Sequence, residues 1–389
     1  MRKRNLWIVV IVLTLIAAAC GSDDDASPPS GDPIVIGIIA DLTGPFTTYG
    51  NSLSRSAELA VKEVNAAGGI DGRPVQVIVE DIQTDVTATV DKARKLVESD
   101  DVDVVMGPIG SDANDAAYQT VVQEGGKLLF YTETYEGGKC DPLYFSFGAV
   151  PAQQIRPMIP ILQDAYGDNV MLFGADYVWP RRSFEIAKPI IADEGGTVVS
   201  ELYLPLIADD FTELVQEVRD KQPDYIFSLY PALWGAALKA LDDAALLDDV
   251  GVGTIFLGDP DYLGITDLAE NSYTALPYFT AAEGSAAEDF LAAYQAEYGA
   301  SEFPSGGEGV GAYNAVWMYK EAVEKAGSTD PAAVAEALVG LSFNGPTGKV
   351  KMTSSHHLEQ TINLVQAQNG EYVLVDSFSN RDPEEACDL

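Results

Sequence analysis

Histidine is almost absent from this sequence, and its scarcity argues against most acid–base and metal chemistry. The only two histidines, His356 and His357, are adjacent, so they cannot lie on one face of a helix or a strand. A zinc site there would lack cysteine or carboxylate ligands at useful spacing, and a Ser-His-Asp triad would have to use one of the pair. We expect both side chains to be exposed in a turn.

Motifs that present a nucleophile or hold a phosphate are also missing. The sequence has no P-loop and no Gly-x-Ser-x-Gly elbow. Its glycine pair at 251–253 and its glycine cluster at 306–311 lack the third glycine of the dinucleotide fingerprint. No pair among the acidic residues stands out as an acid and a base. We therefore expect a protein that is not an enzyme and that holds no metal and no cofactor.

Positive charge is scarce as well. The chain has 23 Lys and Arg residues against 60 Asp and Glu residues, which gives a net charge of −37. Such a surface repels phosphate backbones and anionic membranes, so we expect no nucleic-acid partner. The charge favours solubility but names no ligand.

Long apolar runs are limited to one, at the N-terminus. Three basic residues precede an apolar stretch from Leu6 to Ala19, which is short for a membrane span and typical of a secretory signal. It ends in small residues followed by Cys20, which resembles a bacterial lipobox. We expect residues 1–19 to be cleaved, Cys20 to be lipidated and residues 20–33 to form a disordered tether. The alternative is a plain signal peptide followed by an incidental cysteine.

Cysteine is rare, with two residues beyond Cys20. Outside the cytoplasm, Cys140 and Cys387 could form a disulfide that ties the C-terminal tail to the body of the protein. The sequence alone leaves open whether the two meet.

The 389 residues alternate β-branched runs with amphipathic segments, which predicts an α/β protein with parallel sheets and two lobes. The first series has strands at Ile34–Ala40, Val75–Asp81, Val102–Met106 and Lys127–Tyr131. The second has strands at Asn169–Gly174, Thr197–Leu204, Tyr225–Tyr230 and Thr254–Leu257. Helices at Ala286–Tyr298, Val310–Lys325 and Asp330–Leu338 and three late strands, at Lys349–Met352, Thr361–Gln366 and Tyr372–Ser377, supplement them.

These late segments suggest that the chain crosses between the lobes three times. We place the crossings near Gly148–Pro151, Tyr278–Ala281 and Asn344–Gly348. One lobe then comprises residues 34–148 and 281–344, and the other comprises residues 149–280 and 345–389.

Polar and aromatic residues gather in the loops that follow the strands. In parallel sheets this edge is where ligands bind. The loops read DLTGPFTTYG, GPIGSDAND and YTETYEGGKC in the first series, and GADYVWP, Tyr230-Pro231 and GDPDY in the second. We expect Tyr177 to face a cleft and Trp179 to pack beneath it.

Long, ordered stretches of this sequence resemble the leucine-binding type of periplasmic binding protein, the extracytoplasmic receptors of ABC importers. The stretches that carry the resemblance are IGIIADLTGPFTTYG, NAAGGIDGRPVQVIVEDIQTD, GPIGSDAN and YNAVWMYKEAVEKAGS, within residues 33–380. Further segments, such as GADYVWPRRSFEIAK and FNGPTGKV, look closest to the urea- and short-amide-binding branch. The resemblance implies two Rossmann-like lobes joined by three hinge crossings, which close over a small solute and dock on a membrane permease.

The resemblance also implies a set of ligand contacts where this sequence matches the family. They are Tyr49, Ser111, Asp112, Tyr131, Thr132, Glu133, Tyr177, Tyr230 and Asp259, with Asp261 as an alternative to Asp259. Each has a structural alternative: Ser111 and Asp112 could cap a helix, the tyrosines could be packing, and Glu133 could be solvated. Glu308 could close the cleft, but an exposed loop acid is the better interpretation. The extra carboxylates, Asp112 and Glu133, argue against a free amino-acid carboxylate and favour a neutral or N–H-rich solute.

The function we expect from the sequence is therefore a membrane-anchored, extracytoplasmic receptor of an ABC importer for urea or short amides. The first alternative is a receptor for branched-chain or other amino acids. The second is a ligand sensor of the same fold that signals to a membrane or regulatory partner.

Overall fold

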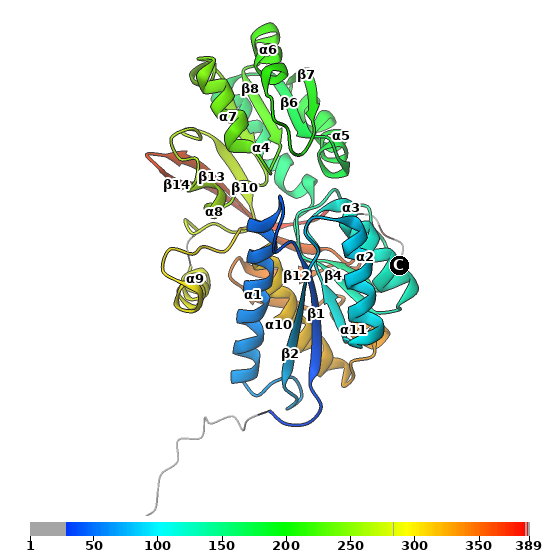
Figure 1. Cartoon of the computed structure of the whole chain (residues 1–389). Coiled ribbons are helices and arrows are strands. Elements are labelled where there is room, and N and C mark those ends of the chain that lie inside the picture. The colour runs from blue at the N-terminus through cyan, green and yellow to red at the C-terminus, as the bar shows by residue number, and fades with distance from the viewer. Residues whose placement is uncertain (1–28, 283, 386, 388–389) are drawn as a thin grey trace, which may run out of the picture.

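The computed structural model describes residues 29–282, 284–385 and 387, which form two lobes, one above the other in Figure 1. The predicted signal segment, Cys20 and the first residues of the predicted tether lie outside this range. Within it, no helix is both long and apolar enough to cross a membrane.

The first lobe is built on a five-stranded parallel sheet with the order β2-β1-β3-β4-β5. Its strands are β1 (Ile34–Ala40), β2 (Val75–Asp81), β3 (Val104–Met106), β4 (Leu128–Tyr131) and β5 (Tyr144–Ser146). All residues of β3, β4 and β5 are buried, as expected for strands that helices cover on both faces.

Helices cover both faces of this sheet. One face packs against α1 (Thr47–Ala66), α10 (Glu308–Ala326) and α11 (Pro331–Leu338). The other packs against α2 (Val86–Arg94) and α3 (Ser111–Ala117), which continue as π-helical turns over Lys95–Ser99 and Tyr118–Glu124. Helix α9 (Ser285–Tyr298) lies against α1 and α10 through Phe290 and Tyr294.

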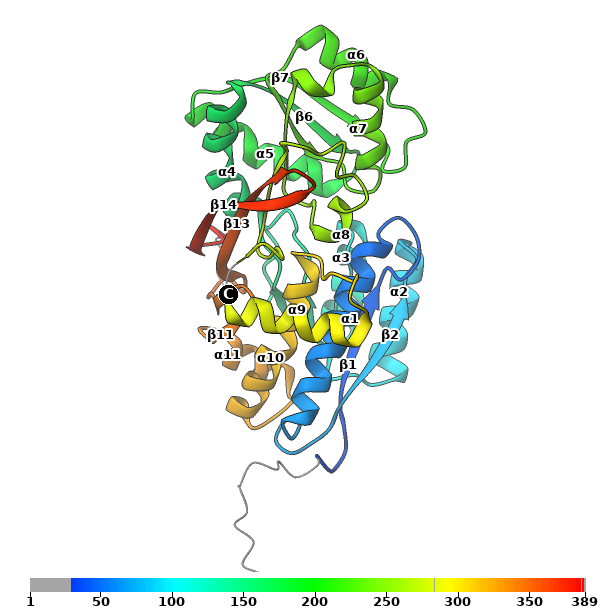
Figure 2. The ribbon, with the colours of Figure 1, turned by 90° about the vertical axis from the view of Figure 1, so that its left-hand side faces the viewer.

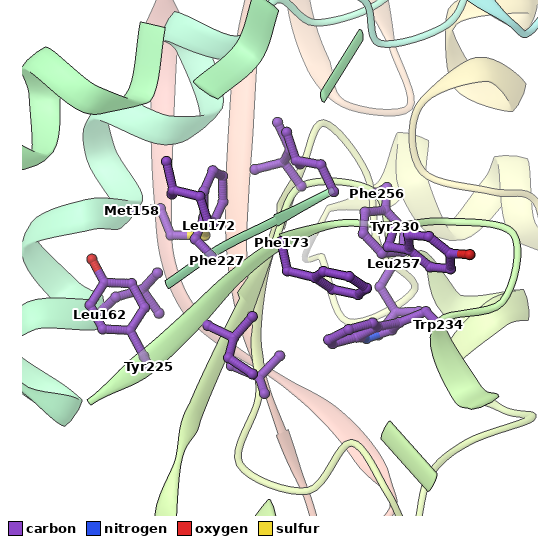
Figure 3. Close-up of a cluster of buried hydrophobic side chains, with 14 of the residues drawn as sticks. Met158, Leu162, Leu172, Phe173, Tyr225, Phe227, Tyr230, Trp234, Phe256 and Leu257 are labelled. Carbon is purple, nitrogen blue, oxygen red and sulfur yellow. The ribbon is translucent and has the colours of Figure 1, made fainter. Parts of the chain in front are cut away.

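The second lobe is built on the parallel series β7-β6-β8-β9-β10, which β13 extends in the antiparallel direction. Its strands are β6 (Asn169–Ala175), β7 (Thr197–Leu204), β8 (Tyr225–Leu229), β9 (Gly251–Thr254) and β10 (Tyr273–Leu276). The helices are α4 (Pro151–Tyr166), α5 (Val178–Asp193), α6 (Thr212–Lys221) and α7 (Trp234–Asp243), with short turns at Leu247–Asp249 and at α8 (Asp259–Tyr262). Figure 3 shows the core of this lobe around Phe173.

Strand β13 (Leu358–Gln368) connects the cores of the two lobes. Its first residue, Leu358, is buried in the core of the first lobe, whereas Ile362 and Leu364 are buried in that of the second. β13 pairs with β12 (Gly348–Met352) and β14 (Glu371–Arg381), and β12 pairs with β11 (Ser342–Gly345). Figure 2 shows β13 and β14 at the level where the lobes meet.

One of the late strands packs in a different lobe from the one to which the sequence-based division assigned it. Val350 and Met352 of β12 are buried in the core of the first lobe, so the change of core falls between Leu358 and Ile362 instead of near Asn344–Gly348. The other two changes of core follow β5 and β10, near the expected places. The limits of the two moving units remain a prediction.

Most predicted elements are present, but three short strands were missed and one was misplaced. The missed strands are β5, β10 and β11, of three or four residues each. β9 begins at Gly251 and ends at Thr254, where the prediction begins. Its two glycines disfavour a strand on propensity, but α4 requires them: a Cβ on Gly253 would lie 2.4 Å from Leu162, and one on Gly251 would lie 2.3 Å from the Tyr166 ring.

The expectation that the two histidines are exposed is wrong. His356 and His357 are 6% and 1% exposed, because their turn folds onto β5, where Ser146 bridges His357. The ring of His356 stacks on Phe145 at 4.0 Å, and His357 hydrogen-bonds the Tyr135 hydroxyl. Burial lowers the pKa of His357 to about 4, so this ring is neutral and structural.

The C-terminal tail returns to the first lobe, where Cys140 and Cys387 form a disulfide with their Cα atoms 5.5 Å apart. Two contacts support this return. Glu385 accepts a hydrogen bond from the Gly138 backbone N–H at 2.8 Å, and Glu384 pairs with Arg156 of α4 at 2.8 Å. The tail is therefore attached to both lobes.

We predict that Cys387→Ser lowers the free energy of unfolding by about 2–5 kcal/mol, because the disulfide closes a very long loop. Urea unfolding of the oxidised protein measures this. Reducing agent should lower the stability of the wild type to that of the variant and should leave the variant unchanged. Equal stability of the oxidised wild type and the variant would contradict the prediction.

Candidate solute-binding site

A cavity lies between the lobes, at the carboxyl ends of the parallel strands. The free volume between its walls is only about 30 Å³, so the two lobes lie nearly closed on each other. The first lobe contributes Phe46, Tyr49, Ile109, Gly110, Ser111, Glu133, Thr134 and Glu308, and the second contributes Tyr177, Trp179, Pro231, Phe256 and Leu276. Nearly all of these residues lie at the end of a strand or in the loop that follows one, as the geometry of parallel α/β sheets requires.

Aromatic rings form a continuous wall from one lobe to the other. Phe46 contacts Tyr49 of its own lobe at 6.3 Å and Tyr177 of the other lobe at 6.4 Å between ring centroids. Trp179 lies 6.3 Å from Tyr177 and 6.4 Å from Phe256. The wall offers an apolar surface, and its ring faces can also attract a cation.

Three carboxyl groups from three segments gather on the polar side. Glu133 follows β4, Asp261 belongs to α8, and Glu308 is the first residue of α10, where it is 2% exposed. One oxygen of each, together with the Tyr49 hydroxyl, is buried and makes no well-aligned hydrogen bond among the described residues, although Glu133 and Glu308, and likewise Tyr49 and Asp261, lie close enough to share a proton. Buried polar atoms are nearly always paired in folded proteins, so these atoms mark a place built to bind polar hydrogens.

Burial raises the pKa of all three carboxyls, and the charge of Glu308 raises it further at Glu133 and Asp261. Burial is the largest cause at Glu133 and the charge of Glu308 the next, and together they hold the pKa of Glu133 well above its usual range. Burial followed by the charge of Glu308 raises the pKa of Asp261 to about 8. Burial also raises the pKa of Glu308. No lysine, arginine or histidine is among the residues that line the cavity in the described part of the chain.

The hydroxyl of Ser111 is directed at a protein carboxylate. It donates to Glu136 at 2.9 Å, and burial raises the pKa of Glu136. The Thr134 backbone N–H likewise donates to Glu133, at 2.6 Å. Two donors of the cavity wall are thus already engaged by acidic side chains.

The structure brings four of the expected ligand residues together in the cavity wall: Tyr49, Ser111, Glu133 and Tyr177. Trp179, which we expected beneath the cleft, also lines it. Ligand contact by these residues remains a prediction, because geometry alone places them at the site.

The structure puts the other five expected residues outside the wall. Asp112 is exposed, and Thr132 is buried behind Glu133. The Tyr131 hydroxyl donates to the Ile109 carbonyl at 2.5 Å, and the Tyr230 hydroxyl donates to the Pro205 carbonyl at 2.5 Å. The Tyr230 ring stacks on Phe173 at 5.0 Å, inside the core of the second lobe (Figure 3). The tyrosines therefore hold loops of the site from behind.

Asp259, the expected partner of a ligand ammonium group, is occupied by the protein itself. Its carboxylate accepts hydrogen bonds from the Thr280 backbone N–H at 3.1 Å and from the Thr280 hydroxyl at 2.5 Å. Asp261, two residues later, has the unpartnered oxygen. Of the two, Asp261 is the one that stays a candidate, and its contact with a ligand remains a prediction.

The sequence analysis missed Glu308, Phe46, Phe256 and Leu276 as wall residues. The expectation that Glu308 is exposed is wrong, because α10 begins two residues before its predicted start and its first turn lies in the cleft. Phe256 was missed because the predicted strand included it, whereas β9 ends at Thr254. Leu276 was missed because β10, which it ends, was not predicted. Phe46 lies in a loop that was recognised as polar and aromatic, so its signal was available.

We predict that the free energy of unfolding of the ligand-free protein decreases as the pH rises from 4 to 8. In this range the folded state keeps a proton on Asp261, whose pKa is raised from 3.8 to about 8, whereas the unfolded state has released it. One such group contributes a slope of up to about 1.4 kcal/mol per pH unit. Asp261→Asn should flatten this slope in urea unfolding at a series of pH values. Asp91→Asn on the exposed side of α2 is the control and should keep it; an unchanged slope in Asp261→Asn would contradict the assignment.

Comparison with known proteins places this architecture in one family. A family model described as periplasmic binding protein matches residues 33–371. A Pseudomonas aeruginosa protein named leucine-, isoleucine-, valine-, threonine- and alanine-binding protein is 25% identical over 327 residues, which cover 82% of this chain and 86% of the relative. A Brucella melitensis protein named Leu/Ile/Val-binding protein homolog 3 is 28% identical over 318 residues, or 78% and 83% of the two chains.

Solved structures share the fold. A solute binding protein of an ABC transporter from Rhodopseudomonas palustris, in complex with 3,4-dihydroxy benzoic acid, has a TM-score of 0.81 at 22% identity and covers 91% of this chain and 99% of its own. A branched-chain amino acid transporter substrate binding protein from Streptococcus pneumoniae, in complex with isoleucine, has a TM-score of 0.76 at 22% identity and covers 89% and 99%. The two-lobe α/β fold expected from the sequence is confirmed, and the chain belongs to the periplasmic binding protein family, whose members bind solutes without catalysing a reaction.

Proposed function

We propose that this chain is the receptor of an ABC importer and captures a small solute that has an amino group on an apolar body, as amino acids do. The observation that carries the proposal is the pairing of buried, unpartnered carboxyl oxygens with an aromatic wall in one cavity. Carboxylates bind ammonium and other N–H groups through charge-assisted hydrogen bonds, and the wall takes the apolar part.

The names of the relatives support the amino-acid reading over the urea and amide reading. The curated relatives reported above are named for branched-chain amino acids. The resemblance to the urea and amide branch finds no support in them. The size of the aromatic wall also favours an amino acid over urea, because urea has no apolar part that could contact the five rings.

The mechanism needs binding and closure only. The solute would enter between open lobes, and contacts from both sides would then favour the closed form, in which Phe46 of one lobe meets Tyr177 of the other. A permease would recognise the closed pair of lobes. β13 and the two other connections are the segments in which the hinge motion would occur.

The same proposal places the protein outside the cytoplasm, held at the membrane through a lipid on Cys20. A receptor that delivers solute to a permease benefits from an anchor and a tether. The second candidate, a sensor that signals to another partner, shares the site and differs only in what reads the closed form. Genes for permease and ATPase subunits beside this one would favour transport.

We predict that the purified full chain, in detergent, is stabilised by amino compounds with an apolar body and not by urea. A ligand at about 100 times its Kd raises the free energy of unfolding by about 2.7 kcal/mol, which a thermal shift detects. The panel holds leucine, isoleucine, their amides and amines, urea, acetamide and benzoate. A response to urea or acetamide alone would restore the amide reading, and silence across the panel would overturn the proposed solute class.

We predict that Tyr177→Ala weakens the binding of any ligand found in this panel by about 10-fold or more, because the ring closes the wall between the lobes. Calorimetry measures the effect. Tyr273→Ala, at the far end of β10 in the same lobe, is the matched control and should leave affinity unchanged. Equal losses in both variants would show that Tyr177 acts on stability and not on the ligand.

A further inference from the structure

We propose that the solute of this site is an organic cation, an amine without a free carboxylate beside it. The inference rests on the proposed function and narrows it: amides, esters and simple amines of amino-acid size would bind, and free amino acids would bind poorly. It follows from the charges that surround the cavity and from the hydrogen-bond donors and acceptors in its wall.

Several carboxyl side chains of the protein surround the polar side of the cavity. Glu133 and Glu308 line the cavity, Asp261 adjoins them through Tyr49, and Glu136 lies behind Ser111. These groups come from three segments, the loop after β4, α8 and α10, so the acidity is a property of the site as a whole. Ions of this sign attract a cation and repel a carboxylate in a cavity shielded from solvent.

Two of the donors that could hold a ligand carboxylate are engaged. Ser111 donates to Glu136, and the Thr134 N–H donates to Glu133. The free hydroxyls of Tyr49 and Thr134 can accept from an N–H as readily as they can donate. No basic side chain lines the wall within the described residues to neutralise a second carboxylate.

The acceptors that a cation requires are free. One oxygen each of Glu133, Asp261 and Glu308 is buried and unpartnered, and Glu308 and Tyr49 are only 2% and 7% exposed. An ammonium group has three N–H donors, and Glu133 and Glu308 of the three carboxyls line the cavity itself. The rings of Tyr49, Tyr177 and Trp179 lie beside these groups, and their faces stabilise the same charge.

The pH dependence should follow from the same groups. The titratable residues around the polar side are Glu133, Asp261, Glu308, Tyr49 and Tyr177, and Glu136 behind Ser111. The raised pKa values mean that carboxyl protons must leave when a cation binds. Affinity for a cation should therefore rise with pH between pH 5 and pH 8.

The test compares three probes of one carbon skeleton by calorimetry with the full chain: L-leucine, L-leucinamide and 3-methylbutan-1-amine. We expect the amide and the amine to bind at least about 10-fold more tightly than leucine, since an unpaired buried charge is strongly unfavourable. The affinity of the amine, which stays protonated throughout, should increase from pH 5 to pH 8. Leucine binding as tightly as the amine, or a flat pH profile for the amine, would overturn the inference and leave the amino-group receptor standing. Absence of binding by all three would overturn both.

Glu308→Gln keeps the shape of the side chain and removes its charge. We expect it to weaken binding of 3-methylbutan-1-amine by about 10-fold or more, to reduce the pH dependence and to leave leucine binding no weaker. Glu321→Gln, on the same helix α10 and away from the cavity, is the matched control and should change nothing. If Glu308→Gln does not fold, Glu133→Gln provides the same readout. Unchanged amine affinity in a folded variant would contradict the role of the carboxyl cluster.

Discussion

The burial of like-charged carboxyl groups between two lobes is the interaction on which the rest of this structure depends. Desolvation opposes the ionised forms of Glu133, Asp261 and Glu308, and the charge of Glu308 adds repulsion at the other two. The raised pKa values favour protonated carboxyls in this closed arrangement. The stability of the closed form therefore depends on the protonation of the site.

Rigid supports keep the groups in place despite this cost. Glu133 and Asp261 follow the fully buried strands β4 and β9, and the hydroxyls of Tyr131 and Tyr230 hold the neighbouring loops through the carbonyls of Ile109 and Pro205. Asp259 is fixed by Thr280, which positions α8 and hence Asp261. Residues behind the wall thus determine its shape, as preorganised sites require.

Other segments connect the two lobes and hold the C-terminal tail. β13 passes from the core of one lobe into that of the other, so a change in the angle between the lobes must involve it. The tail beyond β14 returns to the first lobe through the disulfide between Cys140 and Cys387, while Glu384 holds it to α4. The two lobes are therefore connected by covalent and ionic contacts on the side of the tail.

The sequence by itself determined the fold class, the two series of parallel strands and the loops that form the site. Those features follow from local periodicity and from the rule that ligands bind where parallel strands end. Within these loops, the resemblance to the family singled out Tyr49, Ser111, Glu133 and Tyr177, which the structure places in the cavity wall. Only the tertiary structure decided which of two close acids, Asp259 or Asp261, is free, because that depends on Thr280 across the fold. It also buried the histidines and Glu308, and it formed β9 on two glycines, because packing partners far away in sequence outweigh local propensity. Burial and pairing depend on such distant contacts, which periodicity along a chain does not encode.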